Sequence, residues 1–376
     1  MTSKHHELSS ASACSDQDTH FMERAIALAK QGLYTTNPNP RVGCVLVKDG
    51  RIIGEGFHRA AGEPHAEVMA YKNAIEDPQG ATAYVTLEPC AHFGRTPPCV
   101  DKVISMKASR VVIAMIDPNP QVAGSSVKKL QEHGIDVTYG VCESAARALN
   151  PGFIQRMQDG KPYIRAKLAM SLDGKTAMKN GESQWITDSV SRHDVQHWRA
   201  RSSAIITGIN TLLDDNARLN VRLDTDVKQP TRIVFDTHAR LPSSHPFVDV
   251  ESPIIWVTHT NVDAKHALLS REHIIHWQLP IDEQGISLRA FLDKLQTTEC
   301  NELLIEAGAT LTGSFMMQNL VDELVLYIAP KILGHEARNL VNLPGLVHID
   351  DAKKWQLIDN QTLNADARLI FTKKNQ

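Results

Sequence analysis

Two stretches of the chain determine its first domain: His65-Ala66-Glu67, and the segment Pro89-Cys90-Ala91-His92-Phe93-Gly94-Arg95-Thr96-Pro97-Pro98-Cys99. One imidazole and two thiolates form a ligand set that zinc uses at catalytic sites, where the fourth tetrahedral position stays open to water. Zinc lowers the pKa of that water to about 7, so a nucleophile exists at neutral pH. Glu67 stands beside His65 without having to bind the metal, and a carboxylate there can move protons. These residues predict a catalytic zinc site with Glu67 as acid and base.

The spacing of the two cysteines needs an explanation. His-x-Glu followed by Pro-Cys and a second cysteine is the signature of zinc deaminases, which usually place two residues between the cysteines. Here eight residues, 91–98, intervene. Two non-catalytic interpretations stay open: a closed structural zinc site, with His92 as the candidate fourth ligand, and a pair of free buried thiols. We interpret His92 as a loop or substrate-pocket residue, because a glutamate that is not a ligand favours catalysis.

The sequence around this motif alternates between helix and strand patterns. Apolar residues on one face predict a helix from His20, and Asp49-Gly50 predicts a tight hairpin between strands at 43–47 and 51–54. Pro64 fits the first turn of a helix that contains the 65–67 motif and runs to about Ile75. Further elements are expected at 81–87 (strand), 99–106 (helix), 110–116 (strand), 127–133 (helix) and 137–139 (strand). The alternation predicts an α/β domain with a mainly parallel sheet and helices on both faces.

The length and charge of the chain predict a soluble protein with two domains. A chain of 376 residues exceeds the usual size of one core, and 40 basic against 43 acidic residues give no electrostatic case for nucleic acid. Six scattered cysteines indicate a reducing cytoplasm, and we expect neither a signal peptide nor a membrane span. We predict a disordered tail at 1–19, a first domain at 20–150, a linker at 151–162 and a second domain at 163–376.

The second half has its own α/β pattern. Strands are expected at 164–170, 204–207, 232–236, 254–258, 303–306 and 324–330, with helices at 189–199, 287–296 and 310–319. The strand at 303–306 leads into Gly308 and Gly313, a turn of the kind that receives phosphates at a helix N-terminus. The full dinucleotide fingerprint is absent, so plain turn and packing chemistry stays open. Four arginines suit either a phosphate site or a solvated face: Arg199, Arg201, Arg218 and Arg222.

The motifs of the first half resemble a known family. The cysteine segment, together with Asn37-Pro38-Asn39-Pro40-Arg41-Val42-Gly43, is similar to the deaminase half of the bifunctional riboflavin-biosynthesis deaminase/reductases. The resemblance implies a cytidine-deaminase-like α/β/α domain with zinc bound by His65, Cys90 and Cys99 and with Glu67 as proton donor and acceptor. It also implies that Asn39, His58 and Arg95 contact the pyrimidine substrate or its phosphate. An ordinary role in loops and turns stays open for these three residues.

The second half resembles the reductase of the same family. The similarity lies in Lys167-Leu168-Ala169-Met170-Ser171-Leu172-Asp173-Gly174-Lys175, in Ser183-Gln184-Trp185-Ile186-Thr187, in residues 207–215 and in Glu306-Ala307-Gly308. It implies a dihydrofolate-reductase-like α/β domain. An NADPH site is implied at Ala169, Trp185, Thr211, Asp215, Thr237, Gly308, Ala309, Thr310, Leu311, Thr312, Gly313 and Ser314. A site for the ribose phosphate substrate is implied at Ser183, Arg199, Leu219, Arg222 and Glu306.

The resemblance implies two consecutive reactions. Zinc-dependent deamination of 2,5-diamino-6-ribosylamino-4(3H)-pyrimidinone 5′-phosphate comes first, and NADPH-dependent reduction of the ribose to a ribityl chain follows. We expect a cytoplasmic homo-oligomer that works on small molecules, without nucleic acid or membrane. Two alternatives stay open. One is a deaminase of another nucleobase or of nucleic acid with a C-terminal binding module, which the 5% aromatic content disfavours. The other is a non-catalytic sensor of zinc and nucleotide.

Overall fold

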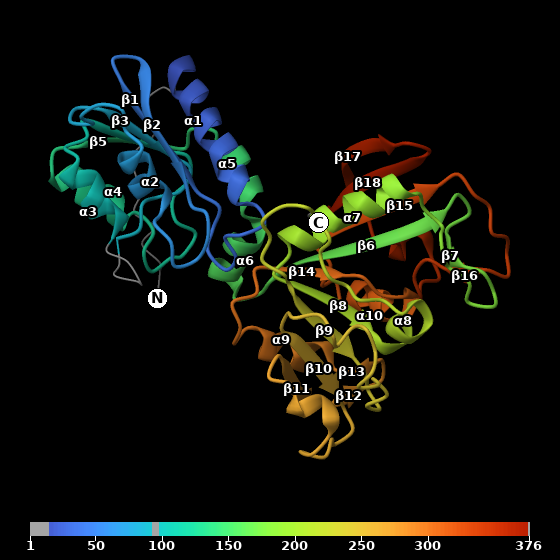
Figure 1. The fold of residues 1–376 in the computed structure, drawn as a ribbon. Helices are drawn as coiled ribbons and strands as arrows, with labels where there is room; N and C mark the ends of the chain where they lie inside the picture. The colour runs from blue at the N-terminus through green and yellow to red at the C-terminus, as the bar shows by residue number, and fades with distance from the viewer. Residues whose placement is uncertain (1–14, 92–97, 375–376) are drawn as a thin grey trace, which may run out of the picture. The chain divides into compact units, whose positions relative to one another are not determined.

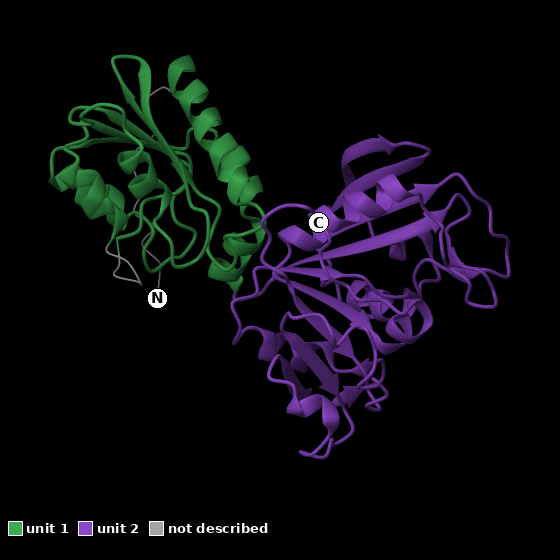
Figure 2. Cartoon of the chain, in the orientation of Figure 1, with its two compact units in different colours: residues 1–159 green, residues 160–376 purple. Residues whose placement is uncertain are grey.

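The computed structural model describes residues 15–91 and 98–374. The chain forms two compact units that adjoin in the sequence between Asp159 and Gly160 (Figure 2). Each unit is an α/β structure with its own sheet (Figure 1). The α/β class predicted for both halves is therefore confirmed. Within the described residues, no helix is long and apolar enough to span a membrane.

The first unit is built on a five-stranded mixed sheet. Its strands, in spatial order, are β2 (Arg51–Phe57), β1 (Gly43–Lys48), β3 (Thr82–Val85), β4 (Arg110–Ile113) and β5 (Asp136–Tyr139). The pairs β3–β4 and β4–β5 are parallel, whereas β1 is antiparallel to both of its neighbours. The predicted hairpin turn is present, with positive φ at Asp49 and Gly50. Because β1 pairs antiparallel with β3 as well as with its hairpin partner β2, the sheet is less parallel than predicted.

Helices cover both faces of this sheet (Figure 1). One layer contains α1 (Asp16–Ala29), which continues into η1 (Lys30–Gly32), and α5 (Glu143–Leu149); the other contains α2 (Ala66–Lys72), α3 (Cys99–Ser105) and α4 (Ser125–Glu132). The predicted disordered tail at 1–19 was too long, because α1 begins at Asp16. Ser15 and Asp18 cap it reciprocally, the Ser15 hydroxyl accepting from the Asp18 amide and the Asp18 carboxylate from the Ser15 amide.

The predicted linker at 151–162 is mostly helical. Helix α6 (Pro151–Asp159) occupies it and belongs to the first unit, where Ile154 is part of the core. Pro151 stands at its first position, where a missing N–H costs no hydrogen bond. The density of proline, glycine and charged residues indicated a linker, but an apolar stripe that packs on the core decided the conformation.

The second unit contains a nine-stranded sheet. Its spatial order is β11 (Ile274–Gln278), β10 (Ile254–Thr258), β9 (Thr231–Phe235), β8 (Ala204–Gly208), β14 (Glu302–Ile305), β6 (Tyr163–Ser171), β15 (Glu323–Ala329), β18 (Asp366–Lys373) and β17 (Trp355–Leu363). The strands from β11 to β15 are parallel, and β18 is antiparallel to both β15 and β17. The β17–β18 hairpin was not predicted, because most side chains of β17 are exposed and give no clear apolar alternation.

Helices and two small sheets complete this unit. The helices are α7 (Ser189–Arg201), α8 (Ile209–Asp215), α9 (Leu288–Leu295) and α10 (Ala309–Met317), with short 3-10 turns at η2 (Ala267–Ser270) and η3 (Ile349–Asp351). The small sheets pair β7 (Lys175–Ala177) with β16 (Arg338–Asn339), and β12 (Ile281–Asp282) with β13 (Gly285–Ile286). The carboxyl ends of the parallel strands β8, β9 and β14 lie at one edge of the main sheet, where α/β proteins bind their ligands.

Candidate active sites

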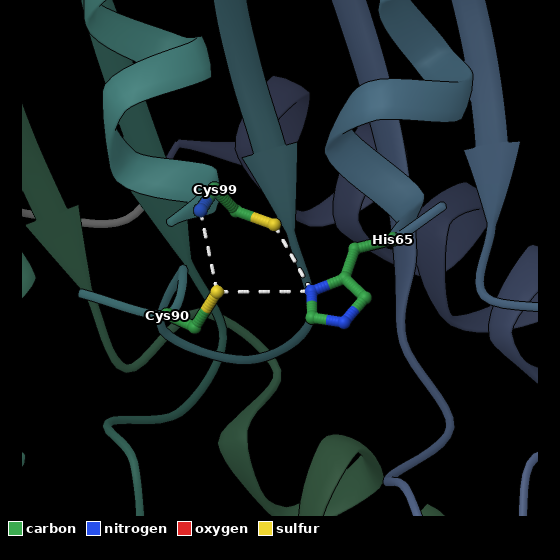
Figure 3. Close-up of side chains that lie close together, drawn as sticks. All are labelled: His65, Cys90 and Cys99. Atoms are coloured by element: carbon green, nitrogen blue, oxygen red, sulfur yellow. Dashed lines mark hydrogen bonds between the residues drawn. The ribbon is translucent and has the colours of Figure 1, made fainter. Parts of the chain in front are cut away.

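The three predicted zinc ligands lie together in the first unit (Figure 3). His65 immediately precedes α2, Cys99 is the first residue of α3, and Cys90 follows β3. The Nδ1 atom of His65 lies 3.0 Å from the Cys99 sulfur and 3.7 Å from the Cys90 sulfur. Helix α2 begins at Ala66 rather than at Pro64, so His65 is its N-cap residue, but the His65 side chain caps no backbone amide and lies against the two sulfurs instead.

This donor set fits a zinc ion. Tetrahedral zinc with bonds of about 2.1 Å to nitrogen and about 2.3 Å to sulfur places these atoms about 3.6 Å apart. Hydrogen bonding with Cys99 lowers the pKa of Cys90 despite burial, and the same contact, with burial, raises the pKa of Cys99. One proton therefore stays on the sulfur pair, and a dication would let both sulfurs ionise. Within the part of the chain that the structure describes, this is the one His/Cys/Asp/Glu group placed to hold a metal.

Glu67 is buried in the first turn of α2. Burial, and to a smaller extent the nearby Cys90 charge, raise its pKa to about 7. A bound dication would lower that value by Coulomb attraction. Burial and the metal thus act on this pKa in opposite directions, and a carboxyl group beside the ligands that can take up and release a proton suits proton transfer in both directions.

Asn39 and His58 form a chain of contacts that leads to the ligand His65. The Asn39 amide nitrogen lies 2.9 Å from His58 Nε2, and His58 Nδ1 lies 3.2 Å from the carbonyl oxygen of Pro64. His58 therefore donates through Nδ1 and accepts through Nε2, as a neutral imidazole does. Burial lowers the pKa of His58, which favours this neutral form. Its ring packs edge-on against His65, with centroids 5.0 Å apart. Asn39 is half-buried; the predicted contact Arg95, like His92, lies outside the described residues.

Sequence reasoning missed one residue of this site, Glu88. Its buried carboxylate accepts hydrogen bonds from the backbone amides of Asp117, Gly124 and Ser126, at 2.9–3.1 Å. The Ser126 hydroxyl also donates to the carbonyl oxygen of Pro89. Glu88 thus anchors the segment that carries Cys90. Its position two residues before a predicted ligand was the available signal.

A large cavity in the second unit lies where the parallel strands β8, β9 and β14 end. Its volume is about 1120 Å³, and the first turns of α10 form part of its wall. Most predicted cofactor residues line it: Ala169, Trp185, Thr211, Asp215, Thr237, Gly308, Ala309, Thr310, Leu311 and Ser314. All predicted substrate residues of this half line it as well: Ser183, Arg199, Leu219, Arg222 and Glu306.

Two residues of the predicted cofactor set lie elsewhere. Thr312 and Gly313 are absent from the cavity wall and are buried in α10. A Cβ atom on Gly313 would lie 2.1 Å from the carbonyl oxygen of Asn342, so this glycine permits a close backbone contact. A helix turns its faces every few residues, and a contiguous run of seven residues therefore could not all face one ligand.

Three charged side chains meet at the floor of the cavity. Arg199 donates two hydrogen bonds to the Glu306 carboxylate, at 2.5 and 2.9 Å, and Lys167 Nζ lies 3.4 Å from the same carboxylate. Burial alone would raise the pKa of Glu306, but the Arg199 and Lys167 charges lower it to about 2. Lys167 begins the sequence motif at 167–175, but its place in the sequence does not reveal its partner.

The arginine cluster divides between two places. Arg218 and Arg222 line the cavity with Arg199, whereas Arg201 pairs with Glu302 at 3.3 Å outside the cavity wall. Burial and the nearby Arg199 lower the pKa of Arg222. An anion between these guanidinium groups would relieve their mutual repulsion, as expected at a phosphate site.

Comparison with known proteins identifies the family. Residues 15–115 match the cytidine and deoxycytidylate deaminase zinc-binding region, and residues 162–369 match the RibD C-terminal domain. The riboflavin biosynthesis protein RibD of Haemophilus influenzae is 45% identical over 96% of this chain and 98% of its own length. This chain belongs to the RibD family. RibD of Escherichia coli is 46% identical over 94% of this chain and 98% of its own length.

Solved RibD structures share the architecture of the whole chain. A structure of Acinetobacter baumannii RibD has a TM-score of 0.89 at 45% identity and covers 96% of this chain and 99% of its own. A Thermotoga maritima protein, described as a diaminohydroxyphosphoribosylaminopyrimidine deaminase and 5-amino-6-(5-phosphoribosylamino)uracil reductase, has a TM-score of 0.85 at 34% identity. It covers 95% of this chain and 99% of its own. The chain is therefore a bifunctional RibD enzyme of riboflavin biosynthesis with a zinc-binding deaminase domain and a nicotinamide-dependent reductase domain.

Proposed function

We propose that this RibD deaminates a diaminopyrimidinone ribosylamino phosphate in its first unit and reduces the ribose of the product in its second. The observation that carries the proposal is the cluster of His65, Cys90 and Cys99 with the buried Glu67 beside it. Among the described residues the cluster offers three ligands, and three protein ligands with a fourth position left to water are typical of catalytic zinc rather than structural zinc. The activities named for the Thermotoga maritima relative supply the substrate class.

In the first unit, His65, Cys90 and Cys99 hold zinc. When bound, zinc acts as a Lewis acid that makes water nucleophilic near neutral pH. Glu67 accepts the proton of the attacking water and delivers a proton to the leaving amino group, so that a carbon–nitrogen bond is replaced by a carbon–oxygen bond and ammonia leaves. The Asn39 carboxamide, held by neutral His58, hydrogen-bonds the pyrimidine, and Arg95 contacts the substrate or its phosphate.

In the second unit, the cavity holds the cofactor and the ribose phosphate together. When bound, the reduced nicotinamide supplies a hydride to the open-chain form of the ribose. Arg218 and Arg222 hold the phosphate, while Arg199 and Glu306 fix the substrate end of the cavity. The Lys167 ammonium, oriented by Glu306, donates a proton to the atom that gains negative charge. Positioning of the two reactants is the main contribution of the protein.

We propose NADPH as the preferred cofactor. In many NAD-binding sites a free carboxylate at the end of a strand binds the ribose hydroxyls, whereas an arginine nearby accommodates the 2′-phosphate of NADP. Here Asp236, just after β9, is fully buried and accepts from the Leu241 amide and Trp256 Nε1, at 2.8 and 3.0 Å. The exposed Arg240 lines the cavity beside Thr237 and offers a guanidinium group to an anion.

The test is a time course with mass spectrometry on the zinc-loaded protein and the diaminopyrimidinone phosphate. We expect exchange of one amino group for oxygen without nucleotide, and a gain of two hydrogens only after NADPH is added. NADH should support the second step more slowly. Persistence of the amine while zinc is bound would refute the deaminase assignment, and the search would then turn to other aminated heterocycles.

A chelator separates the two reactions in the same protein. Removal of zinc is expected to stop ammonia release, because the nucleophile depends on the metal. Reduction of supplied, already deaminated substrate should continue, since the structure places no zinc cluster among the described residues of the second unit. Readdition of zinc should restore ammonia release; failure of the reductase on chelation would contradict this division of labour.

We propose that the enzyme is a homo-oligomer that pairs through the edge strand β17. Residues 356–362 of this strand are exposed, and they include the apolar Leu357 and Ile358. A long exposed edge invites pairing with a second strand. Light scattering should give at least twice the monomer mass, and the double change of Leu357 and Ile358 to glutamate should lower it. The control Ile275→Glu, an exposed residue on the opposite edge strand β11, should leave the mass unchanged.

We propose a cytoplasmic location. None of the cysteines among the described residues takes part in a disulfide: Cys44, Cys90, Cys99, Cys142 and Cys300. Thiols of this kind persist in a reducing compartment, and a zinc site with two cysteines depends on their staying reduced.

A further inference from the structure

Asn150 joins the end of the deaminase unit to the loop that carries Asn39. Its side chain accepts from the Arg41 amide at 2.8 Å and donates to the Arg41 carbonyl oxygen at 2.9 Å. The two residues are 109 positions apart in sequence. Asn150 is buried and ends helix α5, directly before Pro151 begins α6. A single carboxamide thus satisfies both backbone groups of Arg41, as a neighbouring β-strand would.

Other contacts from the same helix junction hold the same loop. The buried Arg41 guanidinium donates to the carbonyl oxygen of Leu149 at 2.8 Å, and Arg156 of α6 approaches the carbonyl oxygen of Pro38 at 3.5 Å. Within the loop, the Asn39 amide donates to the carbonyl oxygen of Thr36 at 2.9 Å. The α5–α6 junction therefore contacts this loop at Pro38 and at Arg41. Asn39 lies between these two residues.

The Asn39 side chain in turn contacts His58, with its amide nitrogen 2.9 Å from His58 Nε2. His58 packs against the ligand His65. A shift of the loop would therefore move the Asn39 carboxamide relative to the metal ligands without touching them. Displacements of about 1 Å at a substrate contact can cost about a hundredfold in rate.

We propose that Asn150 is a positioning residue for deamination, which sets the place of Asn39 by fixing the backbone of Arg41. The proposal rests on the proposed function of Asn39 as a substrate contact. It makes the α5–α6 segment, which immediately precedes the reductase in the chain, part of the deaminase substrate site. Only asparagine's short amide supplies an acceptor and a donor at this spacing, because aspartate lacks the donor and alanine lacks both.

The test is a double-mutant cycle in the full-length, zinc-loaded chain with Asn150→Ala, Asn39→Ala and the double variant. Asn150→Ala should lower kcat/KM of ammonia release about ten- to a hundredfold, mainly through KM, with zinc content and reductase activity unchanged. In the Asn39→Ala background the same change should have no further effect, because Asn150 acts by positioning the Asn39 side chain, which this variant lacks. Asn150→Asp, which keeps the acceptor, should lie between wild type and alanine.

The controls separate positioning from folding. Asn73→Ala removes another asparagine bond to a backbone carbonyl of this unit, that of Glu55 at 2.9 Å, and should keep wild-type deamination. Full additivity of the two losses, or wild-type kinetics in Asn150→Ala, would overturn the proposal. If the purified Asn150→Ala protein lacks zinc, the double-mutant cycle is repeated with Asn150→Asp and Asn39→Ala. Additive losses of kcat/KM in that cycle would overturn the proposal as well. Failure of the proposed function itself would be visible beforehand, because the wild-type chain would release no ammonia.

Discussion

Glu67→Gln is expected to give a protein that binds zinc and reduces its substrate but releases almost no ammonia. Glutamine keeps the size of the side chain in the buried first turn of α2 and removes its ability to accept and deliver a proton. General acid–base catalysis contributes about 10²–10⁴-fold, so kcat of deamination should fall by that factor. The measurement is ammonia release, with zinc content determined on the same sample.

Glu63→Gln is the matched control for this prediction. Glu63 lies two residues before His65 in the sequence, but its carboxylate pairs with the exposed Arg59 side chain. The change should leave ammonia release near wild type, because exposed ion pairs contribute little. If Glu67→Gln lost its zinc together with its activity, Glu67 would be a structural residue; if it kept the activity, the proton-transfer role would be wrong.

Arg199→Met is expected to reduce the reductase about a hundredfold or more while ammonia release continues. The change leaves the Glu306 carboxylate buried with Lys167 as its ion-pair partner at 3.4 Å and with the charge of Arg222 nearby. Removing one partner of a buried ion pair costs about 3–5 kcal/mol, because the other charge stays desolvated. The substrate end of the cavity should therefore lose its geometry. Oxidation of NADPH with supplied deaminated substrate measures the effect.

The pH profile gives this prediction a direction. In the wild type the pKa of Glu306 is depressed to about 2 from its ordinary 4.5, so the stabilisation by its charge is complete above the ordinary value. It is lost as the pH falls toward the depressed value. Without Arg199, the largest charge that lowers the pKa of Glu306 is gone while burial still raises that pKa, so the acid limb of reductase activity should move to higher pH.

Two variants check the assignment to Arg199. Arg199→Lys keeps the charge but loses the two-pronged contact, and should recover part of the activity. Arg289→Met removes an exposed arginine of α9 and should behave as wild type. An unchanged pH profile in Arg199→Met would show that Arg199 does not set the ionisation of Glu306.

The zinc cluster and the elements around it could be predicted because their signals are local and chemical. Histidine, glutamate and proline-flanked cysteines are distinctive residue types, and Asp49-Gly50 favours the positive φ angles that a tight hairpin requires. The α/β class of both halves followed from strand and helix periods. Less regular segments were harder to predict. The segment at 151–162 is predicted as a linker but contains α6, because its apolar residues pack on the core. The first helix is predicted from His20 but begins at Asp16, because a capping box stabilises that end.

The partners of the polar side chains could not be read from spacing. Lys167, Arg199 and Glu306 come from β6, from α7 and from the residue after β14, and only the sheet order brings them together. Glu88 and the three amides that it accepts from are separated by a helix and a strand. A charged residue in a sequence does not show whether it faces water, a substrate or a buried counter-charge.

By itself, the sequence determined the chemistry of the deaminase centre, the α/β class and the family, because residue type and short-range period carry that information. Only the tertiary structure decided which side chains hold the site in place. The clamp of Asn150 on Arg41 spans 109 positions, and the Arg199–Glu306 pair spans 107. The physical reason is that a buried hydrogen bond or ion pair depends on the position of both partners, and long-range packing alone fixes those positions.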